Sequence, residues 1–274
     1  MKGSAPPRIY CIPATKAPIA AVFRRGPARW SHVGRWDLAT NRYEPGAWLA
    51  GRIFPRRSDL SPDGRLLCYF AHKPSATWEH GEAYVALSRL PWLTALHAFG
   101  TCGTWTRGFY FTETEGESAE DSELPMPYGL RSNPVVQFAT ERRRGWEEAA
   151  DSPHRDATDT WDERRNARLE KRQPGGDRLL HVERLGSAGG EVGSDQAVDG
   201  LRVGYWMEAD GRIQPLDYVQ WADWDREGRL LVATRSGKLQ ILELEGDSSR
   251  VLFEEDLSLA EPHPVPAPAW AQRW

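Results

Sequence analysis

The sequence contains few cysteines and no long apolar run. Cys11, Cys68 and Cys102 match neither a CxxC pair nor a zinc-ligand spacing, so neither a disulfide framework nor a zinc site is expected. Cys68 lies inside the apolar run 66–70, which predicts a buried free thiol. Near the N-terminus the longest apolar run, 17–23, is too short to span a bilayer, and no signal peptide precedes it. We therefore expect a cytoplasmic protein without a membrane segment.

The sequence also lacks the short motifs that mark common catalytic and cofactor sites. Its 7 histidines have neither HxH nor HExxH spacing, so we predict no metal site. Phosphate loops, dinucleotide fingerprints and nucleophile elbows are absent, so we predict no cofactor. A net charge of -4 and a pI near 6.0 argue against a general nucleic-acid binder. The arginines at 142–144 and 164–172 alternate with acids, which favours a solvated face over a phosphate track.

An internal repeat is the most informative feature that the sequence does contain. Residues 59–68 (DLSPDGRLLC) align with residues 223–232 (DWDREGRLLV). Both copies have an acid, an apolar or aromatic residue, a turn, and then an acid-Gly-Arg-Leu-Leu run. The copies lie about four periods of roughly 41 residues apart, and a period of this length is typical of propeller blades.

Each copy predicts a turn between two antiparallel strands. Pro62 fixes φ at the start of the turn, and Gly64 supplies the positive φ that such a turn needs. The apolar run that follows, 66–71, has the pattern of a strand packed on both faces. Two more hairpins are predicted, with turns at Thr40–Asn41 and Asp210–Gly211. Long helical periodicity is scarce, so we expect an all-β chain.

These segments resemble the WD40 and TolB-like β-propeller superfamily. The resemblance rests on Leu60–Leu67, Trp224–Leu231 and the Asp37–Thr40 turn, although the Gly-His and terminal Trp-Asp signatures of WD40 repeats are missing. The segments Tyr43–Gly46 and Trp221–Asp225 also resemble a bacterial protein type of unknown function. The resemblance implies one propeller domain over residues 1–274. The length of 274 residues, divided into blades with room for loops, predicts five blades, with six as the alternative.

The two ends of the chain suggest how such a ring would close. Residues 270–274 (WAQRW) resemble residues 221–224 (WADW), which we place on an innermost strand. We therefore predict that the C-terminal strand pairs with the N-terminal blade, residues 17–50, because this pairing hides open sheet edges. A disordered, proline-rich tail is the alternative. Two charge-dense stretches, 113–127 and 141–175, are predicted to be loop insertions.

Charged and aromatic side chains near the repeated turns are the candidate binding residues. Asp59 and Asp223 end the predicted inner strands near the central channel, and Arg56 and Arg57 closely precede the first of them. In one interpretation these side chains grip a polar or anionic ligand. In the other they bond turn backbone or a neighbouring blade. The aromatic candidates on the channel and its face are Trp78, Trp105 and Trp221.

Two classes of function follow from this arrangement. The first is a non-catalytic binding or scaffold module that presents the loops of a rigid ring to a protein partner. The alternative is a propeller-type hydrolase or lyase with carboxylates at the channel, supplied by Asp59, Asp63, Asp223 and Asp225. Spacing in the sequence does not say whether these acids approach the roughly 5–10 Å that paired-carboxylate hydrolysis requires. Function depends on the site and not on the fold alone, so the arrangement of these side chains in space has to distinguish the two classes.

Overall fold

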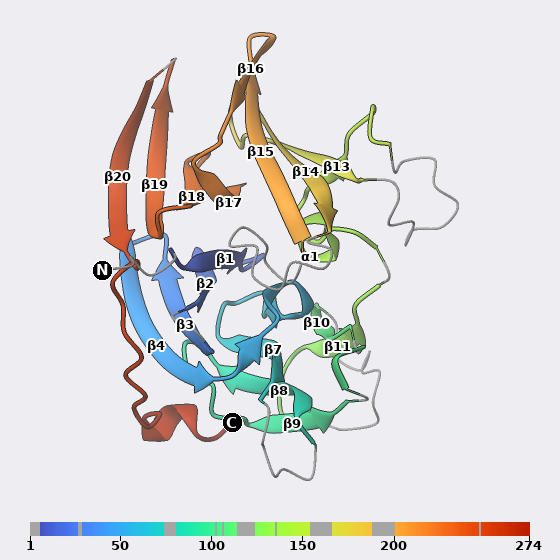
Figure 1. Cartoon of the computed structure of the whole chain (residues 1–274), viewed down its shortest axis with the longest axis vertical. Helices are drawn as coiled ribbons and strands as arrows, with labels where there is room; N and C mark the ends of the chain where they lie inside the picture. Colours follow the sequence, from blue (N-terminus) through green and yellow to red (C-terminus); the bar gives the residue numbers. More distant parts are fainter. Residues whose placement is uncertain are drawn as a thin grey trace. The chain divides into compact units, whose positions relative to one another are not determined.

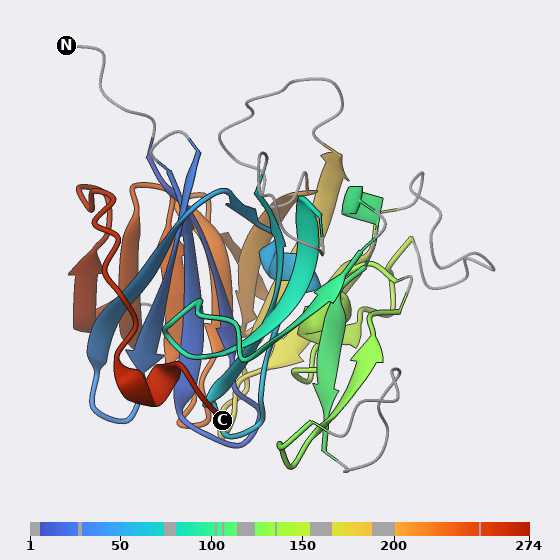
Figure 2. The ribbon, with the colours of Figure 1, turned by 90° about the horizontal axis from the view of Figure 1, so that it is seen from below.

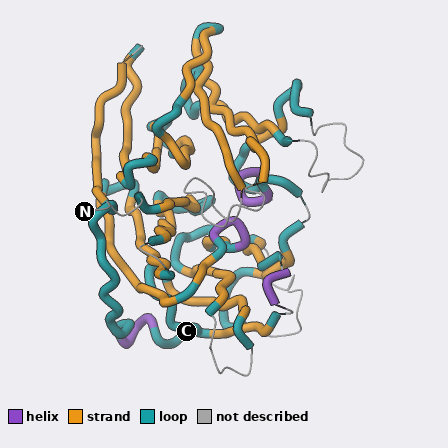
Figure 3. Tube along the Cα trace, in the orientation of Figure 1, coloured by secondary structure: helices purple, strands orange, loops and turns teal. Residues whose placement is uncertain are grey.

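The computed structural model describes residues 6–26, 29–73, 81–101, 103–105, 107–113, 124–134, 136–153, 166–187, 201–246 and 248–274. The chain divides into two compact units. Unit 1 comprises residues 1–10 and 135–260, and unit 2 comprises residues 11–134 and 261–274. Strands dominate both units, and the helices are short (Figure 3). No helix among these residues has the length and apolarity needed to cross a lipid bilayer.

Two larger sheets and a small one contain the first eleven strands (Figure 1). The N-terminal sheet has its strands in chain order: β1 (Arg8–Pro13), β2 (Ile19–Arg25), β3 (Trp30–Asp37) and β4 (Arg42–Ala50). The next has the order β5-β7-β8-β9, with β6 also paired to β7. Its strands are β5 (Arg52–Ile53), β6 (Asp59–Leu60), β7 (Leu66–His72), β8 (Ala83–Arg89) and β9 (His97–Gly100). The small sheet pairs β10 (Phe109–Thr112) with β11 (Gly129–Ser132).

Unit 1 contains two further sheets with their strands in chain order. The first consists of β12 (Glu147–Glu148), β13 (Arg168–Arg172), β14 (Leu179–Ser187), β15 (Leu201–Ala209) and β16 (Arg212–Pro215). The second consists of β17 (Val219–Trp224), β18 (Leu230–Thr234), β19 (Lys238–Glu245) and β20 (Ser248–Asp256). The described helices are α1 (Ala139–Arg142), η1 (Pro55–Arg57), η2 (Gly103–Trp105) and η3 (Ala269–Ala271).

Both copies of the repeat form the predicted turn before a buried strand. Gly64 has φ +74° and Gly228 has φ +77°. The side chain that closes the turn differs between the copies. In the first, Ser61 Oγ accepts a hydrogen bond from the backbone N–H of Leu66 at 2.8 Å. In the second, Asp225 Oδ1 accepts one from the N–H of Arg229 at 2.8 Å. The hydroxyl oxygen in the first turn and the carboxylate oxygen in the second therefore both accept a backbone hydrogen bond that closes the turn.

The strands after these turns, β7 and β18, are buried along almost their whole length, as a strand packed on both faces should be. The other two predicted hairpins are also confirmed. Asn41 lies between β3 and β4 with φ 51°, and Asp210 lies between β15 and β16 with φ 51°. Each unit has its own core. In unit 1, Leu169 and Leu180 from one sheet meet Leu230 from the other.

Replacing Gly228 by alanine should destabilise unit 1 by more than replacing Gly211. Both glycines have positive φ, +77° and +71°, so each alanine costs about 1–2 kcal/mol of backbone strain. A Cβ at Gly228 would also lie 2.4 Å from the carbonyl oxygen of Pro174, whereas one at Gly211 meets nothing within 4 Å. Urea unfolding of Gly228→Ala and Gly211→Ala measures the difference. Equal losses would show that the contact with Pro174 is unimportant.

The prediction that residues 141–175 form a loop insertion is wrong. This stretch supplies two strands, β12 and β13, to the first sheet of unit 1. It also places Trp146 and Leu169 in the core of that unit. In the other predicted insertion, residues 114–123 lie outside the described residues. Leu124 and Met126, at its end, pack against the core of unit 2.

The predicted C-terminal strand is also absent, since residues 261–274 are all described and contain none. They run as coil into η3 (Figure 2). The place beside β2 is taken by β1 instead. The tail is nevertheless ordered in unit 2: Trp274 packs against the core, and Arg89 Nε donates to the Arg273 carbonyl at 3.0 Å. The four prolines 262, 264, 266 and 268 have no N–H to donate, which explains why the tail does not add a strand.

The chain is all-β, as predicted, and four of its five sheets have the four or five strands of a propeller blade. Cys11 and Cys68 are buried free thiols, which confirms the prediction for Cys68. Cys102 lies outside the described residues.

Candidate functional site

Asp59 and the arginines before it occupy structural positions in unit 2. Asp59 is buried on β6, and its Oδ2 accepts a hydrogen bond from the backbone N–H of Phe111 on β10 at 2.9 Å. Arg57 lies in η1 beside Arg56, with its guanidinium carbon 5.0 Å from the ring centre of Phe54. Asp59 thus connects two sheets. A role for these three side chains in binding stays a prediction.

Asp223 and Trp221 are buried on β17 of unit 1. Lys171 on β13 places its Nζ 2.6 Å from Asp223 Oδ1, and the backbone N–H of Trp224 donates to the same oxygen at 2.8 Å. Burial raises the pKa of Asp223, while Lys171 and hydrogen bonds from Trp224 and Trp146 act in the opposite direction. The second repeat aspartate therefore connects two sheets, as the first one does in unit 2.

The other predicted residues do not extend these contacts into a site. Trp78 lies outside the described residues, and Trp105 ends η2 with its side chain undescribed. The remaining carboxylates of the hydrolase hypothesis are engaged in their own turns. Asp63 accepts from Ser61 Oγ at 2.6 Å, and Asp225 accepts from Arg229 Nε at 2.6 Å. Structural bonds therefore account for the orientation of these two acids.

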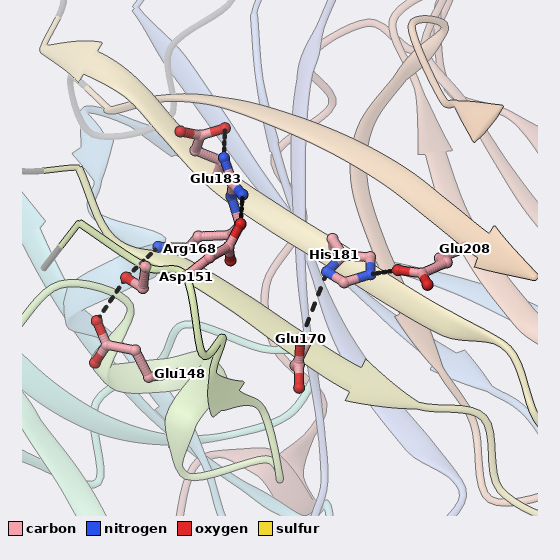
Figure 4. Close-up of polar contacts among 8 residues, drawn as sticks. Glu148, Asp151, Arg168, Glu170, His181, Glu183 and Glu208 are labelled. Carbon is pink, nitrogen blue, oxygen red and sulfur yellow. Dashed lines mark hydrogen bonds and ion pairs between the residues drawn. The ribbon is translucent and has the colours of Figure 1, made fainter. Parts of the chain in front are cut away.

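Sequence reasoning missed a polar cluster around His181 on the first sheet of unit 1 (Figure 4). Glu170, His181 and Trp206 lie opposite one another on β13, β14 and β15. The His181 ring stacks on Trp206 with 5.3 Å between centroids and 5° between planes. Its Nε2 lies 3.3 Å from Glu208, and its Nδ1 lies 4.0 Å from Glu170. His181 is buried, so the two carboxylates and Trp206 define its surroundings.

Arg168 extends this cluster along the same face of the sheet (Figure 4). Its guanidinium pairs with Asp151 and, at 3.5 Å, with Glu183. Its central carbon also lies 5.3 Å from the ring centre of Trp206. The intervening residue Leu169 points into the core, so the cluster occupies the opposite face of the sheet.

The chemistry available to this cluster is limited. A histidine between two carboxylates can hold and pass a proton. A nucleophile would have to contact the histidine, however, and the nearby Ser152 donates to Glu148 at 2.8 Å instead. Nowhere in the described part of the chain do three or more His, Cys, Asp or Glu side chains converge as metal ligands. Cross-strand ion pairs and ring stacking of this kind stabilise sheets, and we assign the cluster that role.

The second candidate is a cleft of about 440 Å³ in unit 1. One wall comes from the β15–β16 hairpin, and the other comes from β18, β19, the turn after β19 and the start of β20. Aliphatic side chains from both walls form its floor: Met207, Leu216, Leu230, Leu242 and Leu244. Ile213 and Tyr218 stand at its mouth, 66% and 48% exposed. Large apolar side chains gathered at an open cleft are typical of ligand-binding surfaces.

Polar groups complete the rim of the cleft. They are Arg178, Asp210, Arg212, Gln214, Ser248 and Ser249. Arg178 is fixed in place, because it donates to the Gly246 carbonyl at 2.9 Å and to Gln173 Oε1 at 3.4 Å. Burial raises the pKa of Tyr218, so its phenol stays neutral and able to donate a hydrogen bond. The cleft thus combines an apolar floor with a few oriented polar groups.

The sequence contains one signal that points toward this cleft. Ile213 is a large apolar residue two positions after the Asp210–Gly211 turn, on a short strand that is exposed throughout in the structure. An exposed apolar residue on a short outer strand is a signal of binding only when it has apolar neighbours. Those neighbours come from β18 and β19, and their proximity depends on the tertiary structure.

Comparison with known proteins gives little further information. No family model matches the chain, and no curated protein matches it. Among solved structures, one similar chain is that of a candidate 6-phosphogluconolactonase from Bacteroides fragilis NCTC 9343. The match has a TM-score of 0.30 and 11% identity, and covers 98% of this chain and 86% of the other. At this TM-score it carries neither an activity nor site residues to the chain.

The prediction of a non-catalytic scaffold that presents loops to a partner is nevertheless contradicted by this comparison. The solved structure bears the name of an enzyme, not that of a scaffold. The carboxylates that we predicted for a channel hydrolase do not replace it, because Asp59, Asp63, Asp223 and Asp225 are held by the structural bonds described above. The cleft and its lining are the remaining basis for a function.

Proposed function

We propose that unit 1 binds a small molecule in the cleft between the β15–β16 hairpin and β18–β19. The observation that carries this proposal is the open side of the cleft, where Ile213 and Tyr218 are exposed and Met207 and Leu244 are only partly buried. The floor leucines Leu216, Leu230 and Leu242 belong to the core and form its base. In a purely structural interface the exposed side chains would be covered. A volume near 440 Å³ also lies within the range of small-molecule sites, about 300–1,000 Å³.

The lining supports a ligand that is mostly apolar and that carries one polar end. Transfer of apolar surface from water onto the leucines contributes roughly 25 cal/mol per Å². Methionine adapts its shape to a ligand, and Met207 lies on the floor. The polar groups sit on the rim, where they orient a ligand without desolvating a charge in the interior.

Filling the cleft should abolish this binding. Ala209 lines the cleft on β15, so Ala209→Trp occupies the space with an indole ring. Ligands identified by saturation-transfer NMR are expected to bind Ala209→Trp at least about tenfold more weakly in calorimetry, a loss of ~1.4 kcal/mol or more. Leu259→Trp is the control, because Leu259 is 85% exposed in unit 1 and does not line the cleft.

The two variants must have similar thermal unfolding temperatures for this comparison to hold. The control should bind within about twofold of the unmodified chain. Unchanged binding by Ala209→Trp would place the ligand elsewhere, and an NMR screen without any binder would contradict the proposed function.

We further propose that the five sheets are blades of one WD40- or TolB-like propeller in the cytoplasm. The repeated turn before β7 and β18 and the blade-sized sheets support this proposal. The free thiols Cys11 and Cys68 suit a reducing compartment. The small sheet β10–β11 would then gain further strands. An experimental structure in which it has only two would contradict the five-blade count.

A further inference from the structure

We propose that the cleft of unit 1 selects an aliphatic carboxylate, and that Arg178 binds the carboxylate group of this ligand. This inference rests on the proposed function, because it names the class of molecule that the cleft takes. Three observations carry it: the partners of Arg178, the chemistry of the floor, and the donors of the β19–β20 turn.

Arg178 keeps its positive charge uncompensated in the described part of the chain. Its two hydrogen bonds go to neutral oxygens, those of Gly246 and Gln173. Other arginines of unit 1 pair with carboxylates: Arg229 lies 2.6 Å from Asp225, and Arg168 pairs with Asp151. A guanidinium that is held in place but not neutralised is ready to form a charge-assisted bond with a carboxylate.

The bonds of Arg178 also show where the charged end of a ligand would lie. Gly246 is in the turn between β19 and β20, and Ser248 and Ser249 line the cleft just after it. The Ser248 hydroxyl donates to the Glu245 carbonyl at 2.8 Å, so Ser249 is the hydroxyl better placed to donate to a ligand. Guanidinium and hydroxyl donors at one end favour an acceptor-only group such as a carboxylate.

The other charges of the rim do not reverse this preference. Asp210 and Arg212 lie on the β15–β16 hairpin and have opposite signs, which leaves the lining with one more positive than negative group. A cationic ligand whose charged end lies at the β19–β20 turn would face the guanidinium of Arg178, since the Asp210 carboxylate lies on the other wall, in the β15–β16 hairpin. Apart from Tyr218 at the mouth, the apolar lining of the cleft is aliphatic, which suits an aliphatic body better than a flat, polar ring system.

Three ligands with the same chain and different ends test this inference: octanoate, octanol and octylammonium. Calorimetry on the full chain should give the tightest binding for octanoate. Arg178→Gln should weaken octanoate about tenfold, whereas the affinity for octanol should change by less than about twofold. Arg178→Lys, which keeps the charge, should retain part of the preference. Arg202→Gln, on an exposed position of β15 outside the cleft, is the matched control.

The outcomes separate the two proposals. If Arg178→Gln binds octanoate normally while Ala209→Trp does not, the cleft binds ligands and the carboxylate inference is wrong. Equal affinities for the three ligands also overturn it. Octanoate binding that persists in Ala209→Trp lies outside the cleft and overturns both proposals. Thermal unfolding of Arg178→Gln shows whether a loss of binding reflects a loss of structure.

Discussion

Acidification from pH 7 to about pH 4 is expected to destabilise unit 2 by about 3 kcal/mol through His32 alone. His32 is 2% exposed on β3, and burial, followed by the positive charge of Arg24, lowers its pKa from 6.5 to about 4. The ring packs against Trp48 with centroids 4.4 Å apart and a tilt of 30°, and its Nδ1 lies 3.4 Å from the Tyr43 hydroxyl. The folded chain therefore keeps His32 neutral at pH values where the unfolded chain protonates it.

The direction of this effect follows from proton binding. Between pH 6.5 and about 4, the unfolded state binds a proton at His32 that the folded state does not bind. Stability is therefore highest above pH 6.5 and decreases as the pH falls. At pH 7 His32 is mostly neutral in both the folded and the unfolded chain. Its titration therefore costs little stability there, and the effect is confined to acid conditions.

Urea unfolding as a function of pH measures this contribution. His32→Gln removes the titrating group, so its stability should depend less on pH than that of the unmodified chain. The variant also loses packing against Trp48, which lowers its stability at every pH and leaves the slope as the informative quantity. His263→Gln, at an exposed position, is the control and should keep the original slope. Parallel curves for His32→Gln and the unmodified chain would refute the assignment.

Lys171→Met is expected to destabilise unit 1 by about 3–5 kcal/mol, because it leaves the buried Asp223 carboxylate without its cation. Their side chains are only 17% and 4% exposed, and the two atoms are 2.6 Å apart. Burial already raises the pKa of Asp223 in spite of Lys171. The chain offers a matched control in Lys238→Met. Lys238 is also 2.6 Å from its carboxylate partner, Glu254, but these side chains are 37% and 38% exposed.

The exposed pair should contribute much less, because solvent screens it, so the two methionine variants isolate the effect of burial at equal distance. Urea unfolding of the single variants and of Lys171→Met/Asp223→Leu completes a double-mutant cycle. The double variant should recover much of the lost stability, because it removes the uncompensated charge. A Lys171→Met loss no larger than that of Lys238→Met would show that the buried pair is not important for folding.

The local features of the fold could be predicted from the sequence because they depend on neighbouring residues. Gly64 and Gly228 mark turns through their own backbone conformation, and the apolar runs after them are strands whatever lies further away. Strand β13 was missed for the opposite reason. Only Leu169 gives it an apolar character, and Lys171 points inward because Asp223, far along the chain, neutralises it.

The candidate site was also beyond the reach of sequence reasoning. The aspartates of the repeat were visible, but each is bound by a partner on another sheet, which no local pattern reveals. The resemblance of residues 270–274 (WAQRW) to residues 221–224 (WADW) likewise suggested a strand that the tail does not form. The cleft is lined by residues of β15, β16, β18 and β19, and only the folded chain brings Leu244 and Met207 into the same lining.

Burial in unit 1 changes sharply from one strand to the next, and this difference bears on motion. β18 is buried at every position, whereas β16 is exposed at every position and is the last strand of its sheet. Strands with few buried contacts open locally at a small fraction of the global unfolding free energy. The β15–β16 hairpin, which forms one wall of the cleft, can therefore open transiently while the opposite wall stays folded. Entry of a ligand would then need only this hairpin to open, and its amides would exchange with solvent more slowly once the site is filled.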